Sequence, residues 1–473
     1  MKRALAAWLH RAPVTVDDLA RFRIVYAVAA LAILPTAGFG VALPAVGFAP
    51  PPGPMSLLAA FPPAWVVGAL ELLTALALAM LAIGWRTVAA SLVSGVLLFV
   101  VSSLANSFGQ IDHIALIATI PLLLAASGWG GRLSIDARRE RPSTWRPWTV
   151  RALAVAIALA YATSAIPKIE GGWLAAGSQA AQGHLNRRLF TGEPGGLLAG
   201  VGRVVGSPIL WEAADIATVL IEVGLVIAVV SWRVFRVALA VATLFHLTIL
   251  LTLGIAFATT VLAYGAFVSW ERWWPAIRAR RVPPVLAACG SVAAAVIAVA
   301  VAELLPPVQA AAETIVVAAG AALGAAFLTR VVARATRRFR SFTADRPSLA
   351  GRLWGAALFG VVLLALPVQL LLTPRFGEPY PAIQGPAFPQ VRLVDGILTA
   401  RNVPFVSVDL ADGTTVPITV GDLLPRSGIS RSTVFRTLFR NKDVARDPST
   451  VAWLEARLDA IMPDADIVKF RVL

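Results

Sequence analysis

Two apolar stretches separated by one arginine indicate the class of this chain: PAWVVGALELLTALALAMLAIGW at residues 63–85 and TVAASLVSGVLLFVVSSLAN at residues 87–106. Glu71 is the only charged side chain within them, and Arg86 is the only residue between them. Each stretch has the roughly 20 apolar residues that a helix needs to cross the ~30 Å hydrocarbon core of a bilayer. The pair predicts two membrane-spanning helices joined by a short connection.

The same pattern recurs along the chain. Of its 473 residues, 58% are hydrophobic and 14% are charged, whereas soluble domains average about 25% charged residues. We therefore predict an all-α polytopic membrane helical bundle of about eleven spans with a small C-terminal extracytoplasmic α+β domain. The predicted spans lie near residues 22–42, 63–85, 87–106, 111–129, 148–168, 210–231, 234–253, 256–271, 283–304, 309–329 and 352–373.

One apolar run needs a division. Val234 to Val268 as one helix would be ~52 Å long at ~1.5 Å per residue, well beyond the ~30 Å hydrocarbon core. We divide it at Gly254. The second half is short, so a re-entrant or tilted segment is the alternative to a full span.

The net charge of +15 reflects topology rather than nucleic-acid binding, because the cations are unevenly distributed between the loops. One set of predicted loops and helix ends holds 25 of the 41 Lys and Arg residues, the opposite set holds 4, and the tail after Thr373 holds the other 12. The positive-inside rule then places the N-terminus in the cytoplasm and the C-terminal domain outside. Arginine-heavy composition favours a bacterial plasma membrane, with membrane lipid as the surrounding partner.

The chain divides into residues 1–275 as the membrane core, 276–373 as additional spans, and 374–473 as the outer domain. In that tail, residues 391–401 and 405–419 are predicted strands, the second folded at Asp412-Gly413 as a type I′ hairpin. Residues 433–441 and 451–462 are predicted helices, the latter capped by Ser449 or Thr450, and residues 467–473 form a last strand. Such a domain offers a surface for an extracytoplasmic protein or peptide partner.

Lys168 is the most informative titratable residue near a predicted span. The chain has 37 Arg but only four Lys, so arginine serves wherever a general positive charge is sufficient. A desolvated ammonium can lose its proton and act as a base, which a guanidinium does not do in practice. The alternative is a lysine that ends its helix and extends to the outer interface beside Trp173.

Two histidines are the candidate supports for this amine. His113 follows Asn106 and Asp112 in a polar hairpin at the predicted outer surface, where Asp112 can orient it or simply cap the next helix. His246 lies inside an apolar helix, where a lone histidine is usually a hydrogen-bonding core residue.

Among the acids in the predicted spans we single out Glu71, Asp215 and Glu222. Glu222 either binds a polar group of a substrate or joins helices, and Glu71 has the same helix-joining alternative. We predict that Lys168, His113 and His246 share one cavity near the outer face.

Four stretches resemble the HTTM (horizontally transferred transmembrane) family, which includes the vitamin K-dependent gamma-glutamyl carboxylases. They are Asp18-Leu19-Ala20-Arg21-Phe22-Arg23-Ile24, Asn106 with His113, Lys168-Ile169-Glu170-Gly171-Gly172-Trp173, and Phe245-His246 with Ile255 and Phe257. The resemblance implies that Lys168 is the base that deprotonates a reduced naphthoquinone of the vitamin K or menaquinone type, with His113 in support. We predict no metal site.

Two departures bear on the activity. The carboxylases carry a pair of lysines where this chain has Pro167-Lys168, and their outer domain is much larger than the tail here. We therefore expect hydroquinone deprotonation or epoxidation without peptide carboxylation. The alternatives are a non-catalytic quinone or lipid carrier, a membrane scaffold, and a transporter, although no paired broken helices of the alternating-access kind are evident.

Overall fold

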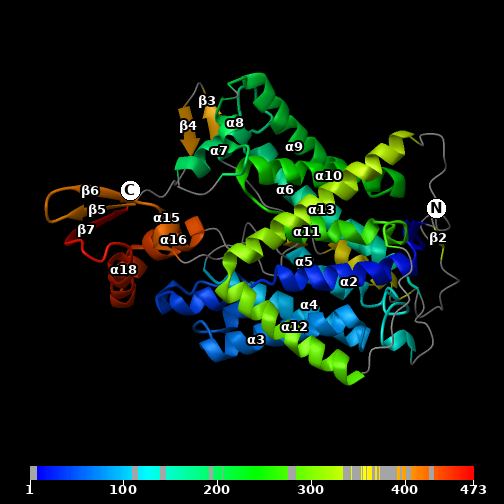
Figure 1. Cartoon of the computed structure of the whole chain (residues 1–473). Coiled ribbons are helices and arrows are strands. Elements are labelled where there is room, and N and C mark those ends of the chain that lie inside the picture. The colour runs from blue at the N-terminus through cyan, green and yellow to red at the C-terminus, as the bar shows by residue number, and fades with distance from the viewer. Residues whose placement is uncertain are drawn as a thin grey trace.

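The computed structural model describes residues 8–108, 115–138, 145–190, 195–204, 206–274, 284–333, 342–343, part of 353–372, 391–394, 397–400, 406–424 and 431–472. Helices make up most of this part of the chain, and small sheets lie mainly toward its C-terminal end (Figure 1). The longer helices are α2 (Val16–Ala32), α3 (Ala64–Ile83), α4 (Thr87–Ala105), α5 (Ala115–Leu124), α6 (Trp148–Glu170), α7 (Ala180–Phe190), α9 (Pro208–Ala228), α10 (Trp232–Leu253), α12 (Pro284–Leu304) and α13 (Pro306–Ala333). Shorter elements of the bundle are α8 (Ala199–Val204), α11 (Ala258–Tyr264) and the 3-10 turns η1 (Gly38–Ala42), η2 (Ala45–Gly47), η3 (Pro54–Leu57), η4 (Asp136–Arg138), η5 (Gly265–Phe267) and η6 (Trp270–Arg272).

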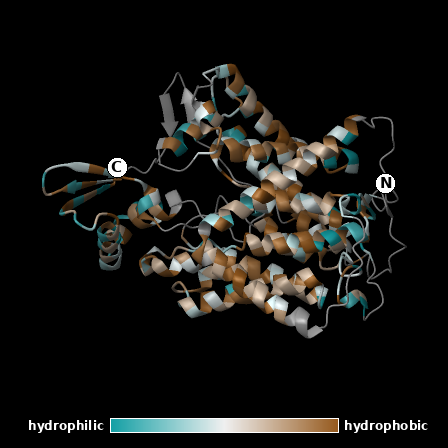
Figure 2. Ribbon diagram, in the orientation of Figure 1, coloured by the Kyte–Doolittle hydropathy of each residue, from teal (hydrophilic) through white to brown (hydrophobic). Residues whose placement is uncertain are grey.

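Five of the described helices are long and apolar enough to cross a membrane: α3, α4, α6, α10 and α13. Figure 2 shows hydrophobic residues along the bundle helices and more hydrophilic ones in the C-terminal domain. The bundle is therefore compatible with membrane insertion, as the composition predicts. Helix α6 is central, because 83% of its most apolar 18-residue window is buried, against 17% for the peripheral α13.

The predicted bounds at residues 63–85, 87–106, 148–168 and 234–253 agree closely with α3, α4, α6 and α10. The predicted division at Gly254 is confirmed: its φ of 69° lies in the left-handed region, and α10 ends there. The helix within the predicted span at 256–271 is short, which favours the alternative of a re-entrant or tilted segment. The apolar helical part of that span, Ala258–Phe267, rises only ~15 Å at ~1.5 Å per residue, too short for the ~30 Å core.

The predicted first span, residues 22–42, is displaced. Helix α2 begins six residues earlier, because Thr15 and Asp18 form a reciprocal capping box. It ends at Ala32, three residues before Pro35. Proline has no backbone N–H to donate to a helical hydrogen bond, so the helix does not continue through it. The remaining apolar residues continue as η1 rather than as helix.

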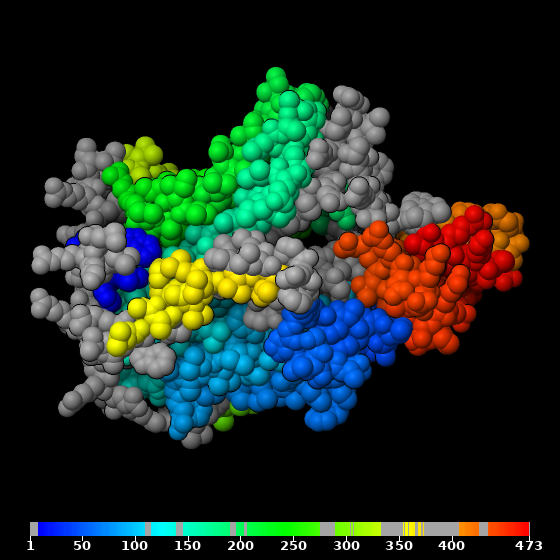
Figure 3. All heavy atoms as spheres, turned by 180° about the vertical axis from the view of Figure 1, so that it is seen from behind, coloured from blue at the N-terminus to red at the C-terminus, as the bar shows by residue number. Residues whose placement is uncertain are grey.

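The two ends of the bundle differ in what they contact. Where α3 ends and α4 begins, Asp136 of η4 accepts hydrogen bonds from the backbone N–H of Arg86 at 2.8 Å and of Thr87 at 2.6 Å. At the other ends of the same two helices, Val67 and Leu104 share a core with the C-terminal domain. That domain therefore packs at the end of the bundle opposite to η4, and Figure 3 shows it in orange and red against the early residues in blue.

The C-terminal domain contains a three-stranded antiparallel sheet of order β6-β5-β7. Its elements are β5 (Val406–Leu410), β6 (Thr415–Ile418), α15 (Val420–Leu423), α16 (Arg431–Phe439), α17 (Lys442–Ala445), α18 (Pro448–Ile461) and β7 (Ile467–Val472). Two further antiparallel pairs lie outside this sheet: β1 (Arg11–Ala12) with β2 (Phe342–Thr343), and β3 (Val391–Val394) with β4 (Ile397–Ala400). The pair of β3 and β4 lies beside α7 (Figure 1).

Two local predictions in this domain need correction. The hairpin at Asp412-Gly413 is not a type I′ turn, because only Gly413, at φ 85°, has a positive φ; a three-residue loop with glycine in the left-handed position connects β5 and β6. Helix α18 is capped by Asp447, whose carboxylate accepts from Ser449 N at 2.9 Å. Pro448 occupies the first helical position, so the cap falls two residues before Ser449.

Candidate functional site

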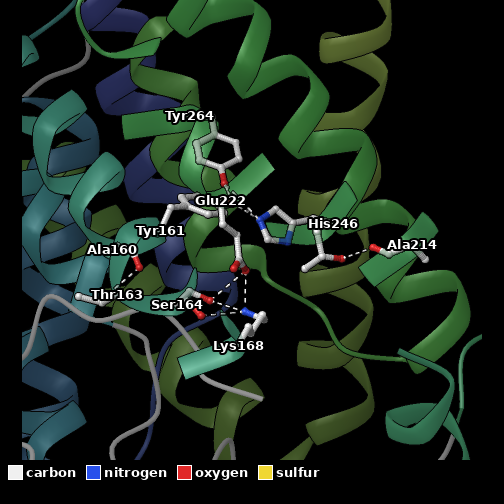
Figure 4. Close-up of polar contacts among 10 residues, drawn as sticks. Ala160, Tyr161, Thr163, Ser164, Lys168, Ala214, Glu222, His246 and Tyr264 are labelled. Atoms are coloured by element: carbon white, nitrogen blue, oxygen red, sulfur yellow. Dashed lines mark hydrogen bonds and ion pairs between the residues drawn. The ribbon is translucent and has the colours of Figure 1, made fainter. Parts of the chain in front are cut away.

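One face of the central helix α6 carries three polar side chains into the interior of the bundle (Figure 4). Tyr161, Ser164 and Lys168 are spaced by three and four residues, which places them on one side of an α-helix. All three are buried, and Lys168 is only 2% exposed. The Lys168 side chain therefore does not extend from the end of α6 to the interface. Trp173 is close to it, with its ring centroid 5.7 Å from Lys168 Nζ.

Lys168 forms an ion pair with Glu222 of α9. Its Nζ donates to Glu222 Oε1 at 2.7 Å, to Ser164 Oγ at 2.6 Å and to the Ser164 carbonyl at 3.2 Å. Ser164 Oγ in turn donates to the same Oε1 at 2.9 Å. One carboxylate oxygen therefore accepts from both the ammonium and the hydroxyl, which fixes the amine against α9.

Tyr161 and Tyr264 meet His246 at one ring nitrogen. Nε2 of His246 lies 2.5 Å from the Tyr161 hydroxyl and 3.1 Å from the Tyr264 hydroxyl, and the two hydroxyls also contact each other. The Phe257 ring lies beside the imidazole, tilted by 40°, with ring centroids 4.8 Å apart. This triad of Tyr161, His246 and Tyr264 joins α6, α10 and α11 through hydrogen bonds in an aromatic setting.

The ion pair and the triad belong to one cluster. Lys168 is near enough to His246, and Glu222 to both tyrosines, for direct electrostatic interaction. Figure 4 shows the Glu222 side chain extending toward Lys168 on the side where His246 faces the tyrosines. The structure thus brings together Lys168 and His246, which the sequence predicts in one cavity, with Glu222, which was selected separately.

Two buried polar atoms of this cluster have no hydrogen-bond partner among the described residues: Glu222 Oε2 and His246 Nδ1. Buried polar atoms are nearly always paired, so such exceptions require an explanation. A polar group of a bound molecule would satisfy them.

The other predicted site residues have varied placements. Asn106 caps α4, and its Nδ2 donates to the Ser102 carbonyl at 2.8 Å. Glu71 accepts from Ala37 N at 2.7 Å and so connects α3 to a loop, whereas its predicted alternative was to join two helices. Asp112 and His113 lie outside the described residues, so their placement in a shared cavity stays a prediction.

Asp215 lies on α9, and its side chain caps the beginning of helix α7. Its carboxylate accepts from Ser178 Oγ at 2.9 Å and from the backbone of Ala180 and Ala181 at 2.7 and 2.8 Å. All of these contacts satisfy the beginning of a helix. Asp215 therefore has a structural task.

Sequence reasoning missed Tyr161, Ser164 and Tyr264. A signal was present, since the chain has only four tyrosines and two of them are in this cluster. The spacing of Tyr161 and Ser164 from Lys168 also marks one helical face. Both clues depend on first accepting Lys168 as the centre.

Comparison with known proteins adds no assignment: no protein-family model, curated protein or solved structure matches this chain.

Proposed function

We propose that this chain is an integral membrane enzyme of the HTTM type in which the Lys168 cluster deprotonates a lipid-soluble hydroquinone. The observation that carries the proposal is a lysine buried against a glutamate and a tyrosine-histidine triad, with Glu222 Oε2 and His246 Nδ1 unpartnered among the described residues. General acid–base chemistry requires titratable groups within hydrogen-bond reach of a bound proton donor. An ion pair with a purely structural role does not need unpartnered polar atoms such as Glu222 Oε2 and His246 Nδ1 beside it.

The proton balance of the pair permits this chemistry. Moving one proton across the 2.7 Å contact converts the ion pair into a neutral amine and a neutral acid without changing its total charge. The neutral Lys168 then accepts a phenolic proton and becomes ammonium beside the new aryloxide. His246 and the tyrosines hydrogen-bond the second ring oxygen. Enclosure in apolar surroundings protects the strong base from water.

Epoxidation is the reaction expected to follow. One hydroquinone and one dioxygen give one quinone epoxide and one water, so no further reductant is needed. The short tail favours this half-reaction over carboxylation of a peptide. A quinone carrier without turnover is the rival function, because the same unpartnered atoms would bind a quinone.

Lys168→Arg provides the sharpest test, because arginine keeps the positive charge and removes the titratable amine. Purified protein is given a reduced naphthoquinone and oxygen, and epoxide is measured. We expect product with the wild type and a loss of at least about 100-fold in Lys168→Arg, the low end of what general base catalysis contributes. Lys442→Ala, at an exposed lysine of the tail, is the matched control and should retain full activity.

Three results distinguish the possibilities. Equal epoxide formation by Lys168→Arg rules out the lysine base. Saturable quinone binding by the wild type without oxygen consumption supports the carrier. If the wild type neither forms epoxide nor binds quinone, the Lys168 cluster is not a quinone site.

We place the protein in a bacterial plasma membrane with the C-terminal domain outside. The uneven distribution of arginines supports this orientation, and so does the position of that domain at the end of the bundle opposite to η4.

A further inference from the structure

A second candidate site lies between α2, α10, α11 and α13, apart from the Lys168 cluster. It is a cavity of about 740 Å³, within the range of small-molecule sites. Its inner wall is apolar. The wall includes Leu239, Val261, Leu262, Val316 and Leu323. Neither Lys168 nor Glu222 lines it, and the shared residue is Tyr264, whose hydroxyl belongs to the triad.

Three arginines line the mouth of this cavity: Arg236, Arg272 and Arg330. Arg236 Nη2 donates to Ser269 Oγ at 3.2 Å, and its guanidinium lies 4.8 Å from the Phe327 ring centroid. The Arg330 guanidinium lies 4.3 Å from the Trp273 ring centroid. None of the three arginines forms an ion pair with a carboxylate in the part of the chain that the structure describes.

The two acids at the same mouth are already engaged. Asp18 accepts from Thr15 N at 3.0 Å and from the backbone of Glu271 at 3.0 Å, so it serves as a helix cap. Glu271 lies 3.8 Å from Arg21. The three arginines outnumber these two acids, of which Asp18 attracts Arg236 electrostatically and Glu271 is close to Arg21, so the lining keeps a net positive charge beside Trp270 and Trp273.

We propose that this cavity binds an anionic membrane lipid, with its phosphate at Arg236, Arg272 and Arg330 and one acyl chain in the apolar interior. Basic pockets between membrane helices bind anionic headgroups, and aromatic residues mark the interface where headgroups lie. A free anion would leave the apolar interior empty. A neutral quinone would leave the arginines without a counter-charge. An anionic amphiphile satisfies both parts of the cavity.

Native mass spectrometry of the delipidated full-length chain tests the proposal, with phosphatidylglycerol and phosphatidylcholine of identical acyl chains as probes. We expect one phosphatidylglycerol to bind at roughly tenfold or more lower concentration than phosphatidylcholine, since each nearby arginine contributes about 1 kcal/mol. The double variant Arg236→Gln/Arg330→Gln should reduce this preference to about fivefold or less, because only Arg272 remains. Arg86→Gln, which removes an exposed arginine outside the cavity, should keep it.

A second pair of variants tests the acyl-chain position without changing charge. Ala319 lines the cavity, and its neighbour Ala318 on the same helix does not, although both are exposed. Ala319→Phe should weaken binding of both lipids, and Ala318→Phe should leave it unchanged. Equal effects of the two substitutions on lipid binding would overturn the proposed position of the acyl chain in the cavity.

Competition with inorganic phosphate distinguishes a site for a whole lipid from a site for a free anion. Failure of millimolar phosphate to displace bound phosphatidylglycerol supports the lipid site. Full displacement overturns it in favour of a simple anion site. Equal affinity of the wild type for the two lipids also overturns the proposal. These outcomes are independent of epoxide formation at Lys168.

Discussion

The ion pair of Lys168 and Glu222 sets the energetics of the site, because the two side chains are only 2% and 5% exposed. Removing one partner of such a pair leaves an uncompensated buried charge, which costs about 3–5 kcal/mol. We expect Lys168→Met and Glu222→Met each to destabilise the protein by about this amount. The double variant Lys168→Met/Glu222→Met should be considerably more stable than either single variant, because it removes both charges.

Thermal unfolding in detergent checks this prediction as a double-mutant cycle. Additive losses in the double variant would mean that the two groups do not compensate each other. The double variant also provides a folded protein without the amine, and we expect it to form no epoxide.

The sequence identified Lys168 because lysine is rare in this chain, and it selected Glu222 and His246 as acids or bases within apolar helices. It did not predict which acid pairs with the amine. Glu71 and Glu222 have equivalent sequence settings, and only the packing of α9 against α6 brings Glu222 to 2.7 Å from Lys168. Interhelical geometry of this kind depends on tilt and rotation, which packing determines.

At the scale of single elements, Asp409 joins β5 to β7. Its Oδ2 accepts from Arg471 Nε at 2.7 Å, and its Oδ1 accepts from Thr415 Oγ1 at 2.9 Å. The hydrogen bond from Arg471, and then that from Thr415, holds the pKa of Asp409 below its usual 3.8. A lowered pKa contributes stability above the unfolded value and loses it as pH falls through the folded value.

We therefore expect the C-terminal domain to lose stability from Asp409 as pH falls below about 4, with Asp409→Asn showing a smaller loss over that range. Pepsin, which cuts at acid pH, can report the opening of the domain in the full-length chain. Arg471→Gln should reduce the acid sensitivity as Asp409→Asn does. An unchanged pH dependence in both variants would contradict a contribution from this pair.

Helix positions were predictable where apolar residues alone decide them, as in α3 and α4. Local signals changed the outcome elsewhere: the capping box moved the start of α2, and Pro35 prevented its continuation. Helices α7 and α8 were not predicted, because their residues lack the long apolar run that marks a span. Their position depends on contacts with α9 and α10.

At the scale of the whole molecule, the C-terminal domain and the bundle share one hydrophobic core. Leu438 of α16 is fully buried, and a Cβ at Gly47 of η2 would lie 2.5 Å from its Cδ2. Thr437 Oγ1 donates to the Phe108 carbonyl at 2.7 Å, and Trp453 Nε1 donates to the Ala42 carbonyl at 2.8 Å. These contacts connect the last hundred residues to the loops of the bundle.

We expect Leu438→Ala to cost about 2–5 kcal/mol and to increase hydrogen exchange both in α16 and in residues 38–57. Val451→Ala is the matched control, because Val451 lies on α18 of the same domain and is exposed, so its effect should stay within about 0.5 kcal/mol. Faster exchange confined to the domain itself would show that Leu438 stabilises the domain without holding it on the bundle.

The proposed orientation of the whole molecule rests on the uneven distribution of arginines, and it requires η4 and the C-terminal domain to lie on opposite sides of the membrane. The single native cysteine, Cys289, is replaced by alanine, and one cysteine is introduced at Arg138 or at Thr414, which are both exposed. We expect a membrane-impermeant maleimide to label Thr414→Cys in intact bacterial cells and Arg138→Cys only after permeabilisation, because positively charged loops remain cytoplasmic. The reverse pattern would invert the orientation. Labelling of both positions in intact cells would mean that η4 and the C-terminal domain are not separated by a membrane.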